Sequence, residues 1–135
     1  MVKLTDEIKA DMQKIRIFPF ATSSPLGEPN VAPINMLILQ EDNETIWVID
    51  NFMQKTLDNV IKNPRASFYI WSPETVGAWQ IKGTITVVSG GPDHEKAKDI
   101  AKARKEGSPA KTLLKMNITD VYSVKPGPTA GKKLM

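Results

Sequence analysis

The sequence predicts a mainly β (α+β) fold, in which six antiparallel strands form a small closed or partly closed barrel with helices around it. Three observations support this prediction. Six segments have the β-branched and aromatic composition of strands, and turns rich in Gly, Pro, Asn or Asp separate most of them. Three further segments carry helix signals. A barrel also limits the exposed strand edges that such a set would leave.

Three helices are expected. Thr5 can cap the first, which begins at residue 6 and runs to about residue 15. The second covers about residues 55–63, where apolar side chains recur at helical spacing before Pro64. The third opens at GGPD (90–93) and continues through a charged stretch to about residue 106.

Six strands complete the predicted elements. Pro19 interrupts the first strand, and Pro33, which lacks an amide hydrogen, requires the second to be an edge or to diverge there from its neighbour. Gly83 in the fifth is typical of a bulge or bend. The six strands cover residues 15–24, 30–40, 45–50, 65–72, 78–89 and 117–125.

Length and composition limit the classes of protein. The 135 residues fit a single domain, 1–135, with about 126–135 as a flexible tail. With no Cys and one His, we predict no disulfide, thiol catalysis or metal site, and we place His94 on an exposed helix start. The acidic N-terminus and short apolar runs indicate a soluble, cytoplasmic protein without a membrane partner. A net charge of +3 suits a small anionic ligand and does not require nucleic acid.

The start of the second helix has an unusual composition. Lys55 and Thr56 occupy its first turn, although a cation is favoured near the opposite end of a helix. Unpaired backbone amides and a partial positive charge at a helix start bind phosphate. The Thr56 hydroxyl would add a hydrogen-bond donor, and the Lys55 ammonium would add a positive charge. The pair therefore indicates a phosphate site, although a solvated surface pair would have the same sequence.

The order of several segments indicates a family. "QKTLDNVIKNPRASFYI", preceded by "TIWVID" and "PNVAPINMLIL" and followed by "GAWQIKGTITVVSGGPDHEKA", resembles the FMN-binding split-barrel proteins, which include pyridoxamine 5'-phosphate oxidase-like and small FMN-binding proteins. The resemblance covers about residues 15–105. It implies a six-stranded Greek-key split barrel and a homodimer with the flavin at the interface.

The resemblance also implies positions for FMN. Lys55 and Thr56 would hold the phosphate, with Gln54 beside them. Trp79 would cover the ring from the other subunit. The remaining positions belong to two segments, of which the first lines the ring and the second lies beneath the ring and the ribityl chain: Pro33, Ile34 and Asn35, and Asp50, Asn51, Phe52 and Met53. No additional phosphate-binding residue earlier in the chain can be placed, and we assign no catalytic residue.

The function expected from the resemblance is an FMN-binding flavoprotein, either an oxidoreductase or an electron-transfer protein. The C-terminal "SVKPGPTAGKKLM" lacks the Arg-x-His-type signature of pyridoxamine-phosphate oxidases, so we do not predict that activity. Two alternatives stay open. The same fold could bind the deazaflavin F420 as a reductase, or a small barrel could be a non-redox module that binds nucleic acid or a protein, which the mixed charges disfavour. Electron donor and acceptor are not assigned.

Overall fold

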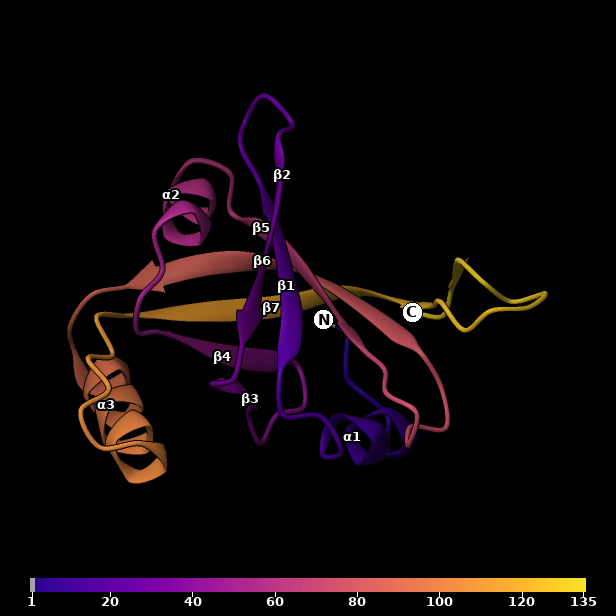
Figure 1. The fold of residues 1–135 in the computed structure, drawn as a ribbon, viewed down its shortest axis with the longest axis horizontal. Coiled ribbons are helices and arrows are strands. Elements are labelled where there is room, and N and C mark those ends of the chain that lie inside the picture. Colours follow the sequence, from indigo (N-terminus) through magenta and orange to yellow (C-terminus); the bar gives the residue numbers. More distant parts are fainter. Residues whose placement is uncertain (1) are drawn as a thin grey trace.

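One antiparallel sheet forms the framework of the protein (Figure 1). The structure is a computed structural model and describes residues 2–135. The strands are β1 (Phe18–Ser23), β2 (Pro29–Ile34), β3 (Leu37–Leu39), β4 (Thr45–Asp50), β5 (Arg65–Ile70), β6 (Trp79–Val88), β7 (Thr112–Ser123) and β8 (Lys132–Lys133). The helices are α1 (Asp6–Met12), α2 (Lys55–Lys62) and α3 (Pro92–Arg104).

The curled sheet confirms the predicted fold class, a mainly β split barrel with peripheral helices. Its strands follow the order β2-β1-β5-β6-β7-β4-β3, with β8 beside β7. β2 and β3 follow each other in the sequence but lie at opposite ends of this order, so the barrel is open between them. The described residues contain eight strands instead of six, although β3 and β8 have only three and two residues.

The predicted strand over residues 30–40 is divided into β2 and β3. β2 is an edge strand that pairs with β1, and Pro33 lies opposite Pro19, so two residues without amide hydrogens face each other. Its pairing ends at Ile34. The Asn35 side chain then donates to the Arg16 carbonyl at 2.9 Å, and the Leu37 amide donates to the Asn35 carbonyl in a tight turn. β3 pairs with β4 instead.

The C-terminal part of the chain contains more β-strand than the sequence predicted. β7 begins at Thr112 instead of residue 117, because its first half pairs with both β4 and β6. Part of the expected flexible tail also pairs. Lys132 and Lys133 form β8 against β7, and the Val121 amide donates to the Met135 carbonyl at 2.7 Å.

The helices cover the ends and the outer face of the sheet (Figure 1). Thr5 caps α1 as predicted, but α1 ends at Met12 and α3 ends at Arg104, both earlier than expected. Ile8 and Met12 of α1 join the larger apolar core. Ala97 and Ala101 of α3 pack in a smaller cluster with side chains of β4 and β7. No helix within residues 2–135 is long and apolar enough to cross a bilayer.

Gly83 lies where β6 and β7 change register. The predicted bulge is confirmed, since the pairing shifts between Lys82 and Gly83. A Cβ atom at Gly83 would lie 2.4 Å from the Asn117 carbonyl oxygen, and the obstructing atom belongs to the backbone of the neighbouring strand. Only glycine allows the two strands to approach this closely.

Gly83→Ala should therefore lower the free energy of unfolding by about 1–3 kcal/mol, because the strands must separate to admit the methyl group. Urea denaturation measures the loss. Thr86→Ala, at an exposed position of the same strand, is the control and should cost at most about 1 kcal/mol. Equal losses in the two variants would contradict the steric explanation.

Candidate functional site

A cavity of about 790 Å³ opens where β2, the 51–54 loop and the start of α2 meet. Its volume lies within the usual range for small-molecule sites. Nine of the eleven residues proposed from the sequence line it, while Asp50 and Trp79 do not. These nine are Pro33, Ile34, Asn35, Asn51, Phe52, Met53, Gln54, Lys55 and Thr56.

The start of α2 forms one wall of this cavity. Gln54 precedes the helix and makes no side-chain cap hydrogen bond to it, so the side chain leaves the first amides uncovered. Asp58, the acidic residue of the first turn, pairs with Lys62 at 3.1 Å. Among residues 2–135, no carboxylate lies within 4.0 Å of the Lys55 ammonium. This wall thus presents positive charge.

Asn30 supports Thr56 from the neighbouring strand. Thr56 is buried, and its hydroxyl accepts a hydrogen bond from the Asn30 side chain at 3.1 Å. The same Asn30 nitrogen lies 3.3 Å from the Thr22 hydroxyl, which also accepts from Asn59 of α2. Asn30 lines the cavity and was missed in the sequence, where it appears only as a polar residue at the start of a strand.

Asp50 shapes the 51–54 loop from behind. Its carboxylate is fully buried, accepts from the Met53 amide at 2.8 Å and accepts from the Thr112 hydroxyl at 2.6 Å. The Lys111 ammonium lies 3.9 Å from the same carboxylate and donates to the Met53 carbonyl. Asp50 therefore fixes the loop backbone and does not reach the cavity itself.

Asn51 connects the 51–54 loop with Met36 and with Ala110, which precedes β7. Its oxygen accepts from the Ala110 amide at 2.9 Å, and its nitrogen lies 3.3 Å from the Met36 sulfur. Ala110 has a left-handed backbone, with φ of 42°, and its carbonyl lies 2.8 Å from His94 Nε2. The expectation of an exposed His94 is wrong: its side chain is 5% exposed, because α3 packs it beneath the chain that leads to β7.

The segment 104–108, which begins with the last residue of α3, is a wall of the cavity that was not predicted from the sequence. Arg104 and Lys105 add two cations to the cavity and Glu106 adds one carboxylate. This segment lies about fifty residues from the start of α2 in the sequence, and only the packing of α3 on β4 and β7 brings the two together. No local pattern could have indicated it.

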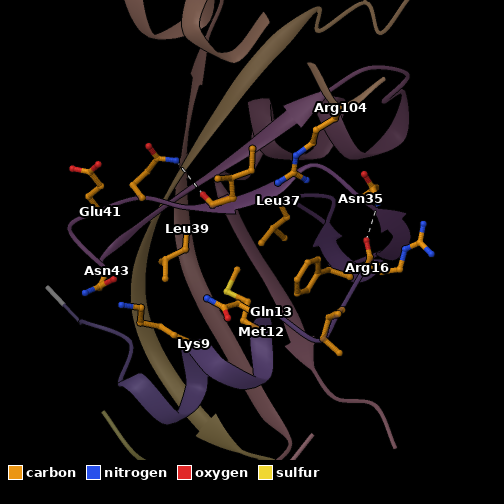
Figure 2. A pocket seen from close by; sticks show the side chains of 14 residues that line it. Lys9, Met12, Gln13, Arg16, Asn35, Leu37, Leu39, Glu41, Asn43 and Arg104 are labelled. Carbon is orange, nitrogen blue, oxygen red and sulfur yellow. Dashed lines mark hydrogen bonds between the residues drawn. The ribbon is translucent and has the colours of Figure 1, made fainter. Parts of the chain in front are cut away.

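A second cavity, of about 660 Å³, adjoins the first (Figure 2). Asn35 and Arg104 line both cavities. Residues 30–36 face the first cavity and residues 37–41 face the second, so the opening between β2 and β3 lies between the two. Figure 2 shows Arg104 extending past Leu37 toward this opening.

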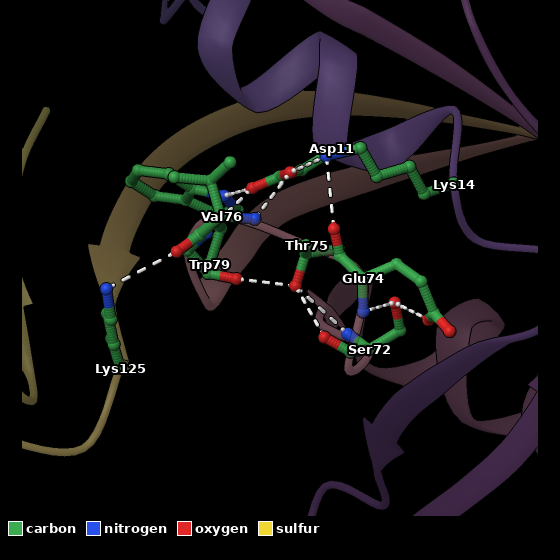
Figure 3. A network of polar contacts seen from close by, with 9 residues as sticks. Asp11, Lys14, Ser72, Glu74, Thr75, Val76, Trp79 and Lys125 are labelled. Atoms are coloured by element: carbon green, nitrogen blue, oxygen red, sulfur yellow. Dashed lines mark hydrogen bonds and ion pairs between the residues drawn. The ribbon is translucent and has the colours of Figure 1, made fainter.

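Trp79 lies away from both cavities, in a polar cluster around Asp11 (Figure 3). Its indole nitrogen donates to the buried Asp11 carboxylate at 2.9 Å, and the amides of Val76 and Gly77 donate to the same carboxylate at 2.9 Å. Lys14 lies 3.1 Å from it. Trp79 therefore does not contribute to the cavity of its own chain, and its contact with a flavin in the other subunit stays a prediction.

The hydrogen bonds on Asp11 control its charge. Burial raises the pKa of this carboxyl, but the donors from Trp79, Gly77, Val76 and Lys14 outweigh burial and hold the pKa well below its ordinary 3.8. Because the pKa of Asp11 is lower in the folded protein, its ionised carboxylate stabilises the fold fully above pH 3.8. This stabilisation of the fold is lost as pH falls below 3.8.

Asp11→Asn should lower the free energy of unfolding at neutral pH by about 2–3 kcal/mol, since the amide cannot replace a charged acceptor of several donors. The difference from the wild type should narrow below about pH 4, where the carboxylate gains its proton in the unfolded chain. Denaturant titrations at several pH values measure both effects. Asp6→Asn, at an exposed position of the same helix, is the control, and a pH-independent difference for Asp11→Asn would contradict the assignment.

Comparison with known proteins places these features in a wider group. The family model for pyridoxamine 5'-phosphate oxidase matches residues 4–125. An uncharacterised protein of Methanocaldococcus jannaschii is 33% identical over 133 residues, which cover 98% of this chain and 88% of that protein. HupZ of Group A Streptococcus superposes with a TM-score of 0.80 at 23% identity, covering 95% of this chain and 99% of that one.

Other proteins with solved structures of this fold are named for different ligands. An FMN-binding protein from Syntrophomonas wolfei has a TM-score of 0.66 at 17% identity, covering 87% of this chain and 88% of that one. The heme storage protein HutZ of Vibrio cholerae has a TM-score of 0.68 at 17% identity, covering 90% of this chain and 95% of that one. An F420 reductase has a TM-score of 0.63 at 18% identity, covering 84% of this chain and 94% of that one. At such identities the likeness shows the fold alone.

Proposed function

This chain belongs to the pyridoxamine 5'-phosphate oxidase-like family of split-barrel proteins, and on that premise we propose that it binds FMN and acts as an oxidoreductase or electron-transfer protein. One observation carries the proposal. The uncapped start of α2 opens into a cavity of suitable size, with Lys55 and Thr56 on its wall.

The phosphate of FMN would lie at this helix start. Backbone amides there carry a partial positive charge, and the Lys55 ammonium has no neighbouring carboxylate among residues 2–135 to neutralise it. The Thr56 hydroxyl accepts from Asn30, which leaves its own hydrogen available to a phosphate oxygen. Asn30 would hold Thr56 in place and act on the phosphate only through it, because its two amide hydrogens are donated to the hydroxyls of Thr22 and Thr56.

The rest of the cavity suits the ring of the flavin. Pro33, Ile34 and Met53 supply apolar surface, while Asn35 and Asn51 supply carboxamides. Such a mixture of apolar walls and a few oriented polar groups is typical of cofactor sites. A bound flavin supplies the redox chemistry, and the protein binds it, orients it and sets the surrounding charge.

We also propose that the chain forms a homodimer with the flavin at the interface. Three large apolar side chains that line the cavity are exposed: Ile17 by 51%, Val31 by 67% and Phe52 by 78%. Exposed apolar side chains gathered around one cavity are typical of an interaction surface. Trp79 of one subunit would then cover the ring held by the other.

Two other ligands are compatible with this fold. F420 would use the same helix start, and the cations at the cavity would suit its acidic tail, so the absorption spectrum must distinguish it from FMN. For haem, the side chains that bind the iron include His, Cys, Tyr and Met. The described residues that line the first cavity include Met36 and Met53 but no His, Cys or Tyr, and His94 lies behind the wall beside the Ala110 carbonyl. The helix start with Lys55 and Thr56, which suits a phosphate, favours a flavin over haem.

Protein that has been incubated with FMN and then separated from unbound FMN should retain flavin absorption bands, with one FMN per chain. Lys55→Ala should weaken binding about tenfold or more, because a charged hydrogen bond is lost, and Asn30→Ala roughly two- to tenfold. Lys62→Ala on the same helix is the control and should bind as the wild type does. A band at the deazaflavin position would favour F420, and a colourless protein that binds neither would exclude the redox function.

Sedimentation equilibrium should give twice the 15.0 kDa mass of the chain. Val31→Glu should shift the protein toward monomers, because a carboxylate would be desolvated at the interface. Ile61→Glu is the matched control, since Ile61 is also exposed but does not line the cavity. A monomeric wild type, or a Val31→Glu variant that stays dimeric, would contradict the proposed interface.

A further inference from the structure

The second cavity has more positive than negative charge. Three cationic side chains line it, Lys9, Arg16 and Arg104, against one carboxylate, that of Glu41. Lys9 lies 4.0 Å from Asp6. Within residues 2–135, neither Arg16 nor Arg104 has a carboxylate oxygen within 4.0 Å. Both guanidinium groups are charged at any physiological pH and offer the forked geometry that fits a carboxylate or phosphate.

The floor of this cavity is apolar. Met12 of α1, Phe18 of β1 and Leu37 of β3 line it and are almost completely buried. Figure 2 shows Leu37 and Met12 in the interior of the view, with Lys9 and Glu41 farther out. The cavity volume of about 660 Å³ lies within the range for small organic ligands. A ligand that fits both the apolar floor and the cationic side chains of this cavity has an apolar body and an anionic group.

Arg104 connects this cavity with the proposed flavin site. It lines both cavities, as does Asn35, whose side chain is oriented by its hydrogen bond to the Arg16 carbonyl. An anion held by Arg104 would thus lie beside Asn35, one of the residues expected along the flavin ring. The chain itself supplies an anion-binding group next to the place where redox chemistry would occur.

We propose that the second cavity binds a small organic anion, with a carboxylate or phosphate held by Arg104 and an apolar body against Phe18 and Leu37. This ligand would be the redox partner of the flavin, and only that assignment of its role rests on the proposed function. Its binding does not depend on that assignment, because the residues of the second cavity carry it without the cofactor.

The test is a calorimetric titration of the protein with benzoate, phenyl phosphate and neutral benzamide, in the presence and absence of FMN. Benzoate or phenyl phosphate should bind, the tighter of the two identifying the preferred anion, and benzamide should bind at least tenfold more weakly. Arg104→Gln should weaken anion binding about tenfold, through loss of a charge-assisted contact. Lys102→Gln removes the same charge from an exposed position of α3 outside both cavities and should have no effect.

Three results would overturn the inference: no binding of either anion at millimolar concentration, equal binding of benzamide, or unchanged anion affinity in Arg104→Gln. FMN binding, followed separately by absorbance, distinguishes the two proposals. Protein that binds FMN but no anion refutes the second site alone. Protein that binds the anions but not FMN refutes the flavin function and retains the site.

Discussion

A single break in strand pairing, between Ile34 and Leu37, determines where the two cavities of this protein lie. An antiparallel barrel that closed there would satisfy every backbone group and fill the space with side chains. Here β2 pairs only with β1 and β3 only with β4, so the chain crosses an open seam in two residues. Both cavities lie along this seam, one on each side, and Asn35 contributes to both.

The walls beside the seam are held by buried polar contacts instead of regular pairing. Asp50 fixes the 51–54 loop through the Met53 amide, and Asn51 links that loop to Met36 and Ala110. Buried carboxylates and carboxamides stabilise a site only when their partners are present, because an unsatisfied group is costly to bury. The arrangement therefore favours one rigid shape for the loop, which a preorganised cofactor site requires.

Local patterns predicted most of the strands, the helix starts and the Lys55-Thr56 wall, because each depends on neighbouring residues. The division of residues 30–40 into two strands could not be predicted, since both halves have strand composition and only the partners differ. Arg104, Asn30 and the burial of His94 were missed for the same reason. Each owes its position to a contact with a distant part of the chain, and a single sequence does not contain that information.

The buried position of His94 has a practical consequence. The sequence contains one histidine, and its ring lies behind the wall of the first cavity, beside the carbonyl of Ala110, whose amide donates to the Asn51 side chain. The chain thus has a single imidazole, which would give one well-separated set of proton resonances in a magnetic resonance spectrum. The His94 ring contacts Ala110, which in turn contacts the cavity-lining Asn51. Its resonances can therefore report movement of that wall without any label or substitution.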